Sequence, residues 1–384
     1  MNNVLSHKVW DLASSLKLTI VCLAALMVLV VGCTLAQVNL GTWGAVEIYM
    51  RRWFVWYDLP GSRFSVPVFP GGALVGAVLM VNIAAAQIRR LELSWKKAGL
   101  WIVHAGLIML FVGEFITGVY QVDTRLVFEE GQTTNFVESS REHELALIDV
   151  TDPAKDEVYG VPDRLMRRAD TIPIPGTPIT LNVRKYFHNA NLSSLAAGEG
   201  PAQATAGVGT GVKVVEVPPV SHDDDVNRTS ALIEPVAGGK SYGTWLVSTV
   251  LGAPQSFTHE GRTYRMEMRT RRWYLPYSLT LKDFKHDVYP GTDIPKNFSS
   301  RVLLDRPQTG EKREVLIYMN NPLRYAGETY YQSGFDPDNR GTILQVVRNP
   351  SWLTPYFSCV LVGLGLVIQF ATHLLGFTFK RRTA

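Results

Sequence analysis

Three ionisable residues lie within long apolar segments of this 384-residue chain. They are His104, in the run GLWIVHAGLIMLF, Glu114, ten residues further on, and His373, in the last apolar segment. Titratable groups are costly in hydrocarbon, and their presence there therefore favours a functional role. A neutral imidazole is a good ligand for haem iron, and an apolar helix around it suits a flat, hydrophobic macrocycle.

Each of these residues also has a simpler interpretation. A histidine such as His104 can hydrogen-bond a neighbouring membrane helix without binding a metal, and the residues alone leave both roles open. His373 lies about 10 Å from the basic tail by helical rise, where an imidazole can reach water, which favours no special role. Glu114 is expected about 15 Å beyond His104, either protonated or paired near the opposite face.

Four segments carry or flank these residues, and each is long enough to cross a bilayer, which takes roughly 20 apolar residues. Residues 120–354, between the third and fourth segments, are polar and long enough for one large or two small domains. The sequence thus predicts a membrane protein with four transmembrane α-helices and a large domain inserted between helices three and four. The predicted spans are residues 18–36, 66–88, 98–119 and 355–378.

The basic residues predict the orientation of the spans. An even number of spans places three basic segments on one side, and the loop 37–65 on the other side holds fewer Lys and Arg residues. Because the side richer in these residues faces the cytoplasm, both termini are expected there and the large domain outside. The net charge of +4 reflects this asymmetry, and we infer no nucleic-acid binding from it. The basic segments are residues 1–17, 89–97 and 379–384.

Glycine spacing predicts how the third span packs. Gly99, Gly106 and Gly113 recur at every seventh residue and form a stripe that lets another helix approach closely. His104 precedes Gly106 by two residues, or about 200° around the helix. We therefore expect His104 to face away from the stripe.

The large domain is predicted to be β-rich. Short β-branched and aromatic runs alternate with turn residues, and no long amphipathic helix stands out. Residues 191–212 contain few large apolar groups and predict a mobile loop, which could divide the domain into two lobes. The predicted strands are RLVFEEGQ, PITLNVRKYF, PYSLTLKDF, REVLIYMNNP, GETYYQSGF and TILQVVRNP.

Cysteine and tryptophan positions limit the function further. Cys22, Cys33 and Cys359 all lie in predicted spans, which excludes a disulfide framework, a C-x-x-C redox pair and a C-x-x-C-H haem attachment site in the large domain. The loop 37–65 carries the clusters TWG and RRWFVWYD, which an aromatic girdle at the membrane interface explains. A cofactor-stacking surface is the alternative. The stretch SHDDDV, with His222, predicts a solvated acidic loop or a weak cation site.

Several stretches carry a more specific signal. They include WDLASSLKLTIVCLAALMVLVVGCTLAQ, MVNIAAAQIRRLE, GLWIVHAGLIMLFVGEFITGVYQ with its His-x-Gly element at His104, and the turn FEEGQ. The most specific is the pattern L-x-D-F, Y-P-G-T, F-x-S, M-N-x-P-L-x-Y and Y-Q-S, within residues 281–333. Together they resemble the ResB family, also called CcsB, of the system II cytochrome c maturation machinery. Residues 140–270 are the least similar part.

This resemblance implies a function in haem handling. The family pairs with a ResC (CcsA) protein, moves haem b across the bacterial inner membrane and supports its attachment to the C-x-x-C-H motifs of apocytochrome c. Thiol-reducing proteins act in the same pathway. The family takes one axial haem ligand from the span that contains His104, and the opposing histidine and a W-G-x-x-W-x-W-D segment from the partner. WFVWYD matches that segment only superficially.

The resemblance therefore implies a non-catalytic or co-catalytic subunit of a cytochrome c synthase (haem lyase) complex, and we assign no catalytic residue. His373 is a second candidate haem ligand if the third and fourth spans pack together. One alternative is a membrane-anchored binding or sensor protein without haem. Another is a small transporter with Glu114 and His104 as a proton relay, although the four spans show no internal repeat.

Overall fold

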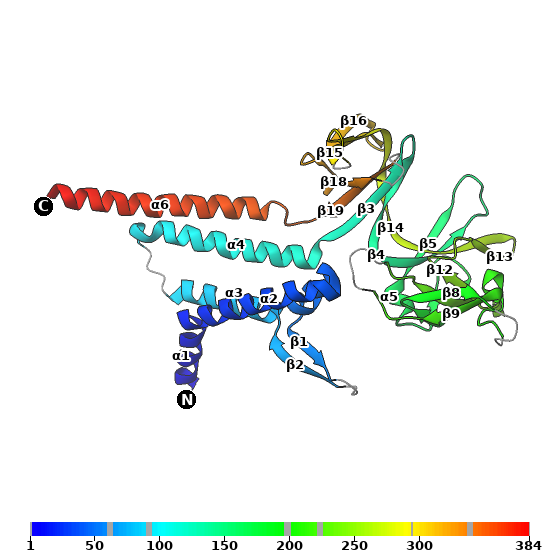
Figure 1. Ribbon diagram of the computed structural model, residues 1–384, viewed down its shortest axis with the longest axis horizontal. Coiled ribbons are helices and arrows are strands. Elements are labelled where there is room, and N and C mark those ends of the chain that lie inside the picture. Colours follow the sequence, from blue (N-terminus) through cyan, green and yellow to red (C-terminus); the bar gives the residue numbers. More distant parts are fainter. Residues whose placement is uncertain are drawn as a thin grey trace. The chain divides into compact units, whose positions relative to one another are not determined.

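The computed structural model describes residues 2–59, 64–89, 94–195, 201–220, 226–292, 295–335 and 341–383. Within these ranges the chain divides into two compact units. The first, residues up to Gln121 and from Asn349 onward, is mainly helical, and the second, from Val122 to Arg348, is built of strands (Figure 1). The prediction of a large β-rich domain is thus confirmed. Parts of the predicted segments 89–97, 191–212 and 379–384, and the SHDDDV stretch, lie outside the described residues.

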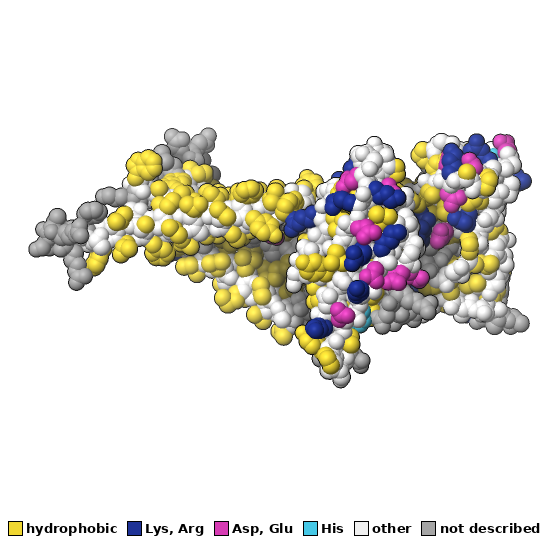
Figure 2. Space-filling model, turned by 90° about the horizontal axis from the view of Figure 1, so that it is seen from above, with side chains coloured by type: hydrophobic (Ala, Val, Ile, Leu, Met, Phe, Trp, Pro, Cys, Tyr) yellow, Lys and Arg dark blue, Asp and Glu magenta, His cyan; other side chains and the backbone are white. Residues whose placement is uncertain are grey.

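Four helices of the first unit are long and apolar enough to cross a membrane, as predicted. Their surface is largely apolar, whereas the β-rich unit carries interspersed acidic and basic side chains (Figure 2). These helices are α2 (Leu16–Val46), α3 (Gly72–Arg89), α4 (Ala98–Tyr120) and α6 (Thr354–Thr383). The shorter α1 (Asn2–Ala13) precedes them, the π-helix η1 (Glu47–Arg51) continues α2, and the 3₁₀ turn η2 (Trp95–Lys97) leads into α4.

The loop predicted over residues 37–65 and the start of the second span differ from the prediction. The first helix continues through Val46 and bends at Gly41, whose φ of 68° suits glycine because it lacks a Cβ. Residues Ser65–Pro70 form strand β2, which pairs with β1 (Phe54–Asp58), so that α3 begins only at Gly72. The proline-rich, β-branched sequence SVPVFP explains the strand, because proline lacks the N–H that a helix interior requires.

The glycine stripe of α4 packs against α6, as the spacing predicts. A Cβ built at Gly99 would lie 2.5 Å from the carbonyl oxygen of Gly365. At Gly106 it would lie 2.8 Å from Val362, and at Gly113 it would lie 2.4 Å from Thr354. Only residues without a side chain permit so close an approach, and the stripe therefore fixes this helix pair.

A buried amide joins α3 to the break between α1 and α2. Asn82 is fully buried, accepts a hydrogen bond from Thr19 Oγ1 (2.6 Å) and donates to the carbonyl oxygens of Ala13 (2.7 Å) and Ser15 (3.0 Å). Ser15 also caps the start of α2. Because the partners of Asn82 lie far away in sequence, they fix the position of α3 beside the start of α2.

The β-rich unit contains antiparallel sheets with separate cores. In the large sheet the strand order is β16-β15-β14-β4-β3-β19-β18-β17, with β13 added to β14 and β5 added to β4. A smaller sheet has the order β11-β10-β7-β6 with β12 on β10, and β8 pairs with β9. The 27-residue strand β14 contributes Tyr264 and Met266 to one apolar core and Leu279 and Leu281 to another, and these cores define two lobes.

The bounds of the elements of this unit are β3 Val122–Glu129, β4 Thr133–Asp149, β5 Glu157–Pro162, α5 Asp163–Met166, β6 Thr171–Pro173, β7 Ile179–Phe187, β8 Ala190–Ser194, η3 Gly207–Gly211, β9 Val212–Glu216, β10 Ser230–Ala237, β11 Lys240–Ser241, β12 Trp245–Ser248, β13 Gln255–His259, β14 Arg262–Val288, β15 Pro295–Arg306, β16 Glu311–Tyr318, β17 Leu323–Tyr325, β18 Glu328–Phe335 and β19 Gly341–Arg348. All six predicted strand runs fall on strands.

Residues 191–212, predicted as a mobile loop, contain strand residues at both ends of the part that the structure describes. Residues Ala190–Ser194 and Val212–Glu216 pair as β8 and β9, and Ala204 is buried in an apolar core. A Cβ at Gly209 would lie 2.5 Å from Leu246. The small residues of this stretch therefore permit close packing, a role that composition alone does not distinguish from mobility.

Candidate functional site

A cavity of about 330 Å³ lies between α2, α3 and the first turns of α4, and His104 lines it. Its size falls within the range of small-molecule pockets. Half of the lining residues are apolar and half are polar. The lining residues are Leu16, Thr19, Asn82, Ile83, Ala86, Gln87, Lys97, Leu100, Trp101 and His104.

Backbone geometry fixes the state of the His104 ring. Its Nδ1 lies 2.8 Å from the carbonyl oxygen of Leu100, which can only accept, so Nδ1 carries the proton and donates it. In the neutral ring Nε2 is then the unprotonated nitrogen, which is the atom that can bind a metal. Histidine ligands commonly donate their other N–H to a backbone carbonyl in this way. As predicted, His104 faces away from the glycine stripe, because the cavity lies toward α2 and α3 whereas the stripe meets α6.

Neither of the other intramembrane candidates lines this cavity. The third and fourth spans do pack together, but His373 lies 2.9 Å from the side-chain amide of Gln369 on its own helix. Gln369 in turn accepts a hydrogen bond from the backbone N–H of Leu100. Glu114 is exposed on α4. The structure therefore does not bring His104 together with either residue at this cavity.

Sequence reasoning overlooked three cavity residues. Asn82 interrupts an apolar run in the same way as His104 does, but a neutral amide does not carry the signal of an ionisable group. Trp101 and Lys97 precede His104 by three and seven residues, which places them on the same helix face. This spacing in the sequence indicates that both residues lie on the helix face of His104.

The tryptophan cluster RRWFVWYD forms part of the β1–β2 hairpin and does not line the cavity. The side chains of Trp53 and Trp56 are about half exposed, while Val55 packs against α3. An interfacial girdle and a stacking surface both need exposed rings, so the geometry is compatible with either.

In the β-rich unit, the ResB-like motifs meet one another within one lobe. The FEEGQ turn bonds to the L-x-D-F segment, since Gly131 N–H donates to the Leu281 carbonyl (2.8 Å) and Glu130 accepts from Phe284 N–H (2.7 Å). Ser300, from F-x-S, donates to Gln332 of Y-Q-S (2.6 Å). These motifs thus build the lobe.

Two buried tyrosines strengthen the same lobe. The hydroxyl groups of Tyr277 and Tyr330 lie 2.6 Å apart, and both lie within 3.1 Å of a Glu328 carboxylate oxygen. Burial is the largest cause that raises the pKa of both phenols, and the neighbouring carboxylate adds to it. Both hydroxyl groups therefore stay protonated and act as hydrogen-bond donors.

The other lobe holds a cluster of buried titratable groups. His143 is 3% exposed, with Nδ1 3.1 Å from Thr229 Oγ1. Burial lowers its pKa, and Asp163 opposes this shift only in part. Tyr186 donates to Asp163, and burial raises the pKa of Tyr186 to about 12. Within the described residues, no group of three His, Cys, Asp or Glu side chains could hold a metal ion.

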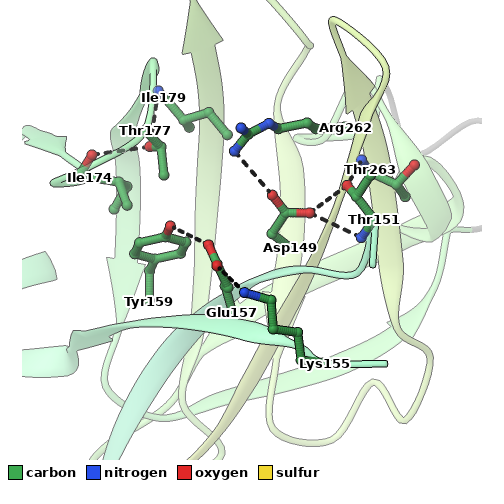
Figure 3. Close-up of polar contacts among 10 residues, drawn as sticks. All are labelled: Asp149, Thr151, Lys155, Glu157, Tyr159, Ile174, Thr177, Ile179, Arg262 and Thr263. Atoms are coloured by element: carbon green, nitrogen blue, oxygen red, sulfur yellow. Dashed lines mark hydrogen bonds and ion pairs between the residues drawn. The ribbon is translucent and has the colours of Figure 1, made fainter. Parts of the chain in front are cut away.

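A surface cavity of about 430 Å³ in the same unit is lined by charges that already have partners. Figure 3 shows Asp149 between Thr151 and Arg262, and Glu157 between Lys155 and Tyr159. Burial alone would raise the pKa of Asp149, but the hydrogen bonds from Thr151 and the charge of Arg262 outweigh it and lower the pKa. The internal pairing is typical of a loop held by its own contacts.

Comparison with known proteins identifies the β-rich unit. Residues 240–343 match the model of the ResB-like family, and this range contains the whole motif pattern at 281–333. This part of the chain is similar to the ResB-like family. It is also similar to protein NrfI of Wolinella succinogenes, with 39% identity over 93 residues, which cover 24% of this chain. The match spans only 10% of the length of NrfI. The ResB-like match lies in the unit that does not contain His104.

Proposed function

We propose that this ResB-like protein acts in cytochrome c biogenesis as a membrane subunit that holds haem on its way to apocytochrome c. Haem b is the cargo, and a ResC (CcsA)-like membrane protein is the partner that supplies the opposing axial ligand. The protein resides in the bacterial inner membrane with both termini in the cytoplasm and the β-rich unit outside. It assists a cytochrome c synthase without a catalytic residue of its own.

The observation that carries this proposal is the state of His104. Its ring lines a cavity, and the Leu100 carbonyl holds Nδ1 as a donor, so Nε2 is available for iron. Trp101 and the apolar side chains of α2 and α3 supply a surface suited to the face of a macrocycle. Haem iron bound by a neutral imidazole can pass on by ligand exchange with a partner histidine.

The β-rich unit has a supporting role in this proposal. It contains no cysteine, so it cannot form a mixed disulfide with the reduced thiols of an apocytochrome. Its ResB-like motifs build a rigid lobe, on which an unfolded apocytochrome segment can be presented to the haem-bearing partner.

The test is the absorption spectrum of the protein purified in mild detergent, alone and with a ResC-like partner. Haem in the wild type that is lost or spectrally altered in His104→Ala, and restored by added imidazole, would support ligation by His104. His373→Ala is the matched control and should keep the wild-type spectrum. Equal haem with unchanged spectra in wild type and His104→Ala would refute the ligand assignment. Loss of haem in His373→Ala alone would instead assign the iron ligand to His373 on α6.

A further inference from the structure

The cavity around His104 has a charged end, and both apolar and uncharged polar side chains line the rest of it. Lys97 lines it directly before the first residue of α4, and Gln87 lines it near the last residue of α3. His104 lies seven residues further along α4, which is about 10.5 Å by helical rise and almost the same direction around the helix. Trp101 lies between the two on the same face. The three side chains thus form one wall that begins with a cation and ends with an imidazole.

We infer that Lys97 positions the ligand by pairing with a carboxylate at its edge. The site then selects a planar macrocycle that carries anionic substituents, and it admits that ligand in one orientation. This inference rests on the proposed function, because it takes the ligand of His104 to be haem.

Electrostatics supports this assignment. A carboxylate cannot enter an apolar cavity without a partner, because burying an unpaired charge costs several kcal/mol. Among the lining residues only Lys97 carries a fixed positive charge. The N-terminus of the 23-residue helix α4 adds a partial positive charge at the same end. The anionic edge of a ligand therefore belongs beside Lys97, and the iron belongs deeper, at His104.

The experiment compares haem with its dimethyl ester, in which both carboxylates are masked. Each is titrated into the full-length protein in detergent, with the partner present, and binding is followed by the absorption change that depends on His104. Wild type should bind haem about three- to tenfold more tightly than the ester, the range expected for a partly solvated ion pair. Lys97→Gln should remove this preference without changing the spectrum of the bound haem, because the iron ligand is unchanged.

Two variants serve as controls. Lys97→Arg keeps the charge and should keep the preference for haem. Lys17→Gln removes a cation from the first turn of α2 that does not line the cavity, and it should also keep the preference. Equal affinity of wild type for haem and ester, or an undiminished preference in Lys97→Gln, would overturn the role of Lys97 while leaving ligation by His104 intact. If neither compound binds in a His104-dependent way, the proposed function itself fails, and the inference falls with it.

Discussion

The two units of this protein place a histidine in opposite surroundings. In the β-rich unit His143 is almost fully buried and lies within hydrogen-bonding distance of Thr229. In the helical unit His104 is partly exposed and lines a cavity, with one nitrogen fixed by the Leu100 carbonyl. Within the part of the chain that the structure describes, Nε2 of His104 has no hydrogen-bond partner. The same side chain is thus enclosed by protein in one unit and presents a ring nitrogen to a cavity in the other.

This difference follows from how each unit is held together. Strand pairing and apolar cores fill the β-rich unit, and its ResB-like motifs serve that packing. The helical unit is held by a glycine stripe, a buried amide and one smaller apolar cluster that includes residues of α2 and α3, and a cavity remains beside α4. The family match therefore reports on the architecture of the β-rich unit, whereas the cavity reports on the chemistry that the helical unit can support.

The largest effect is expected at a buried ion pair of the β-rich unit. Arg269 and Glu144 form a buried ion pair, with Arg269 Nε 3.1 Å from Glu144 Oε1 and both side chains under 10% exposed. Arg269→Met leaves the carboxylate buried without its partner and should lower the free energy of unfolding by about 3–5 kcal/mol. Denaturant unfolding in detergent measures it. The double variant Arg269→Met/Glu144→Leu should recover much of the loss, and no recovery would contradict the ion-pair explanation.

A smaller effect is expected at the helix pair. Gly106→Leu adds a side chain where a Cβ alone would lie 2.8 Å from Val362, and it should cost about 3 kcal/mol by overpacking. Gly118→Leu is the matched control on the same helix, because a Cβ there meets nothing within 4 Å. The thermal unfolding midpoints of both variants in detergent provide the measurement. Equal midpoints would mean that the α4–α6 contact does not stabilise the unit.

The buried amide gives the next effect. Asn82→Leu removes three hydrogen bonds, including the one that the buried amide donates to the Ala13 carbonyl, which should cost about 2 kcal/mol. Since Asn82 also lines the cavity, the substitution should broaden or shift the absorption spectrum of haem held there under the proposed function. Val81→Ala, at an exposed neighbouring position, should change neither stability nor spectrum. An unchanged spectrum in Asn82→Leu would show that haem does not bind beside this wall of the cavity.

The smallest effect is a pH dependence confined to the β-rich unit. Burial lowers the pKa of His143 below its ordinary value of 6.5, so the unfolded chain binds a proton more readily than the folded one. The contribution of neutral His143 to the free energy of unfolding is fully present above about pH 6.5 and is lost as the pH falls below that value. Asp163, which faces His143, partly opposes the shift, whereas His188 and Arg125 reinforce it.

His143→Gln should therefore flatten the decline of the unfolding midpoint between about pH 6.5 and 5. The lowered carboxyl pKa values of Asp149 and Glu234 act in a separate window, because their contribution is lost only below the ordinary carboxyl range near pH 4. A wild-type profile with no decline between pH 6.5 and 5 would show that protonation of His143 is not coupled to unfolding.

Local patterns predicted much of this molecule. The lengths of the apolar segments predicted the four helices, and runs of β-branched residues predicted the strands. The seven-residue spacing of glycines predicted the helix contact and the direction in which His104 points. Local patterns failed where packing or proline chemistry decides the outcome. SVPVFP resembled a helix entrance but forms a strand, and the small residues at 191–212 pack tightly although their composition predicts mobility.

The candidate site could be predicted only in part. His104 stands out by its chemical type, and its cavity residues on α4 follow from helical spacing. The contributions of Thr19 and Asn82 depend on how α2 and α3 are placed, which no local pattern encodes. The Leu100 hydrogen bond that fixes the imidazole tautomer also required coordinates, although its four-residue spacing is the ordinary helical one.

The spacing of Gly99, Gly106 and Gly113 has a geometric consequence. Seven residues fall slightly short of two full helical turns, so a contact line with this repeat drifts, and the two helices must coil around each other with a left-handed twist. From Gly99 to Gly113 the line is about 21 Å long, roughly two thirds of the hydrocarbon thickness of a bilayer. A single residue inserted between Gly106 and Gly113 would rotate the rest of α4 by about 100° off the line. This helix pair can therefore lengthen or shorten only in steps of a whole heptad.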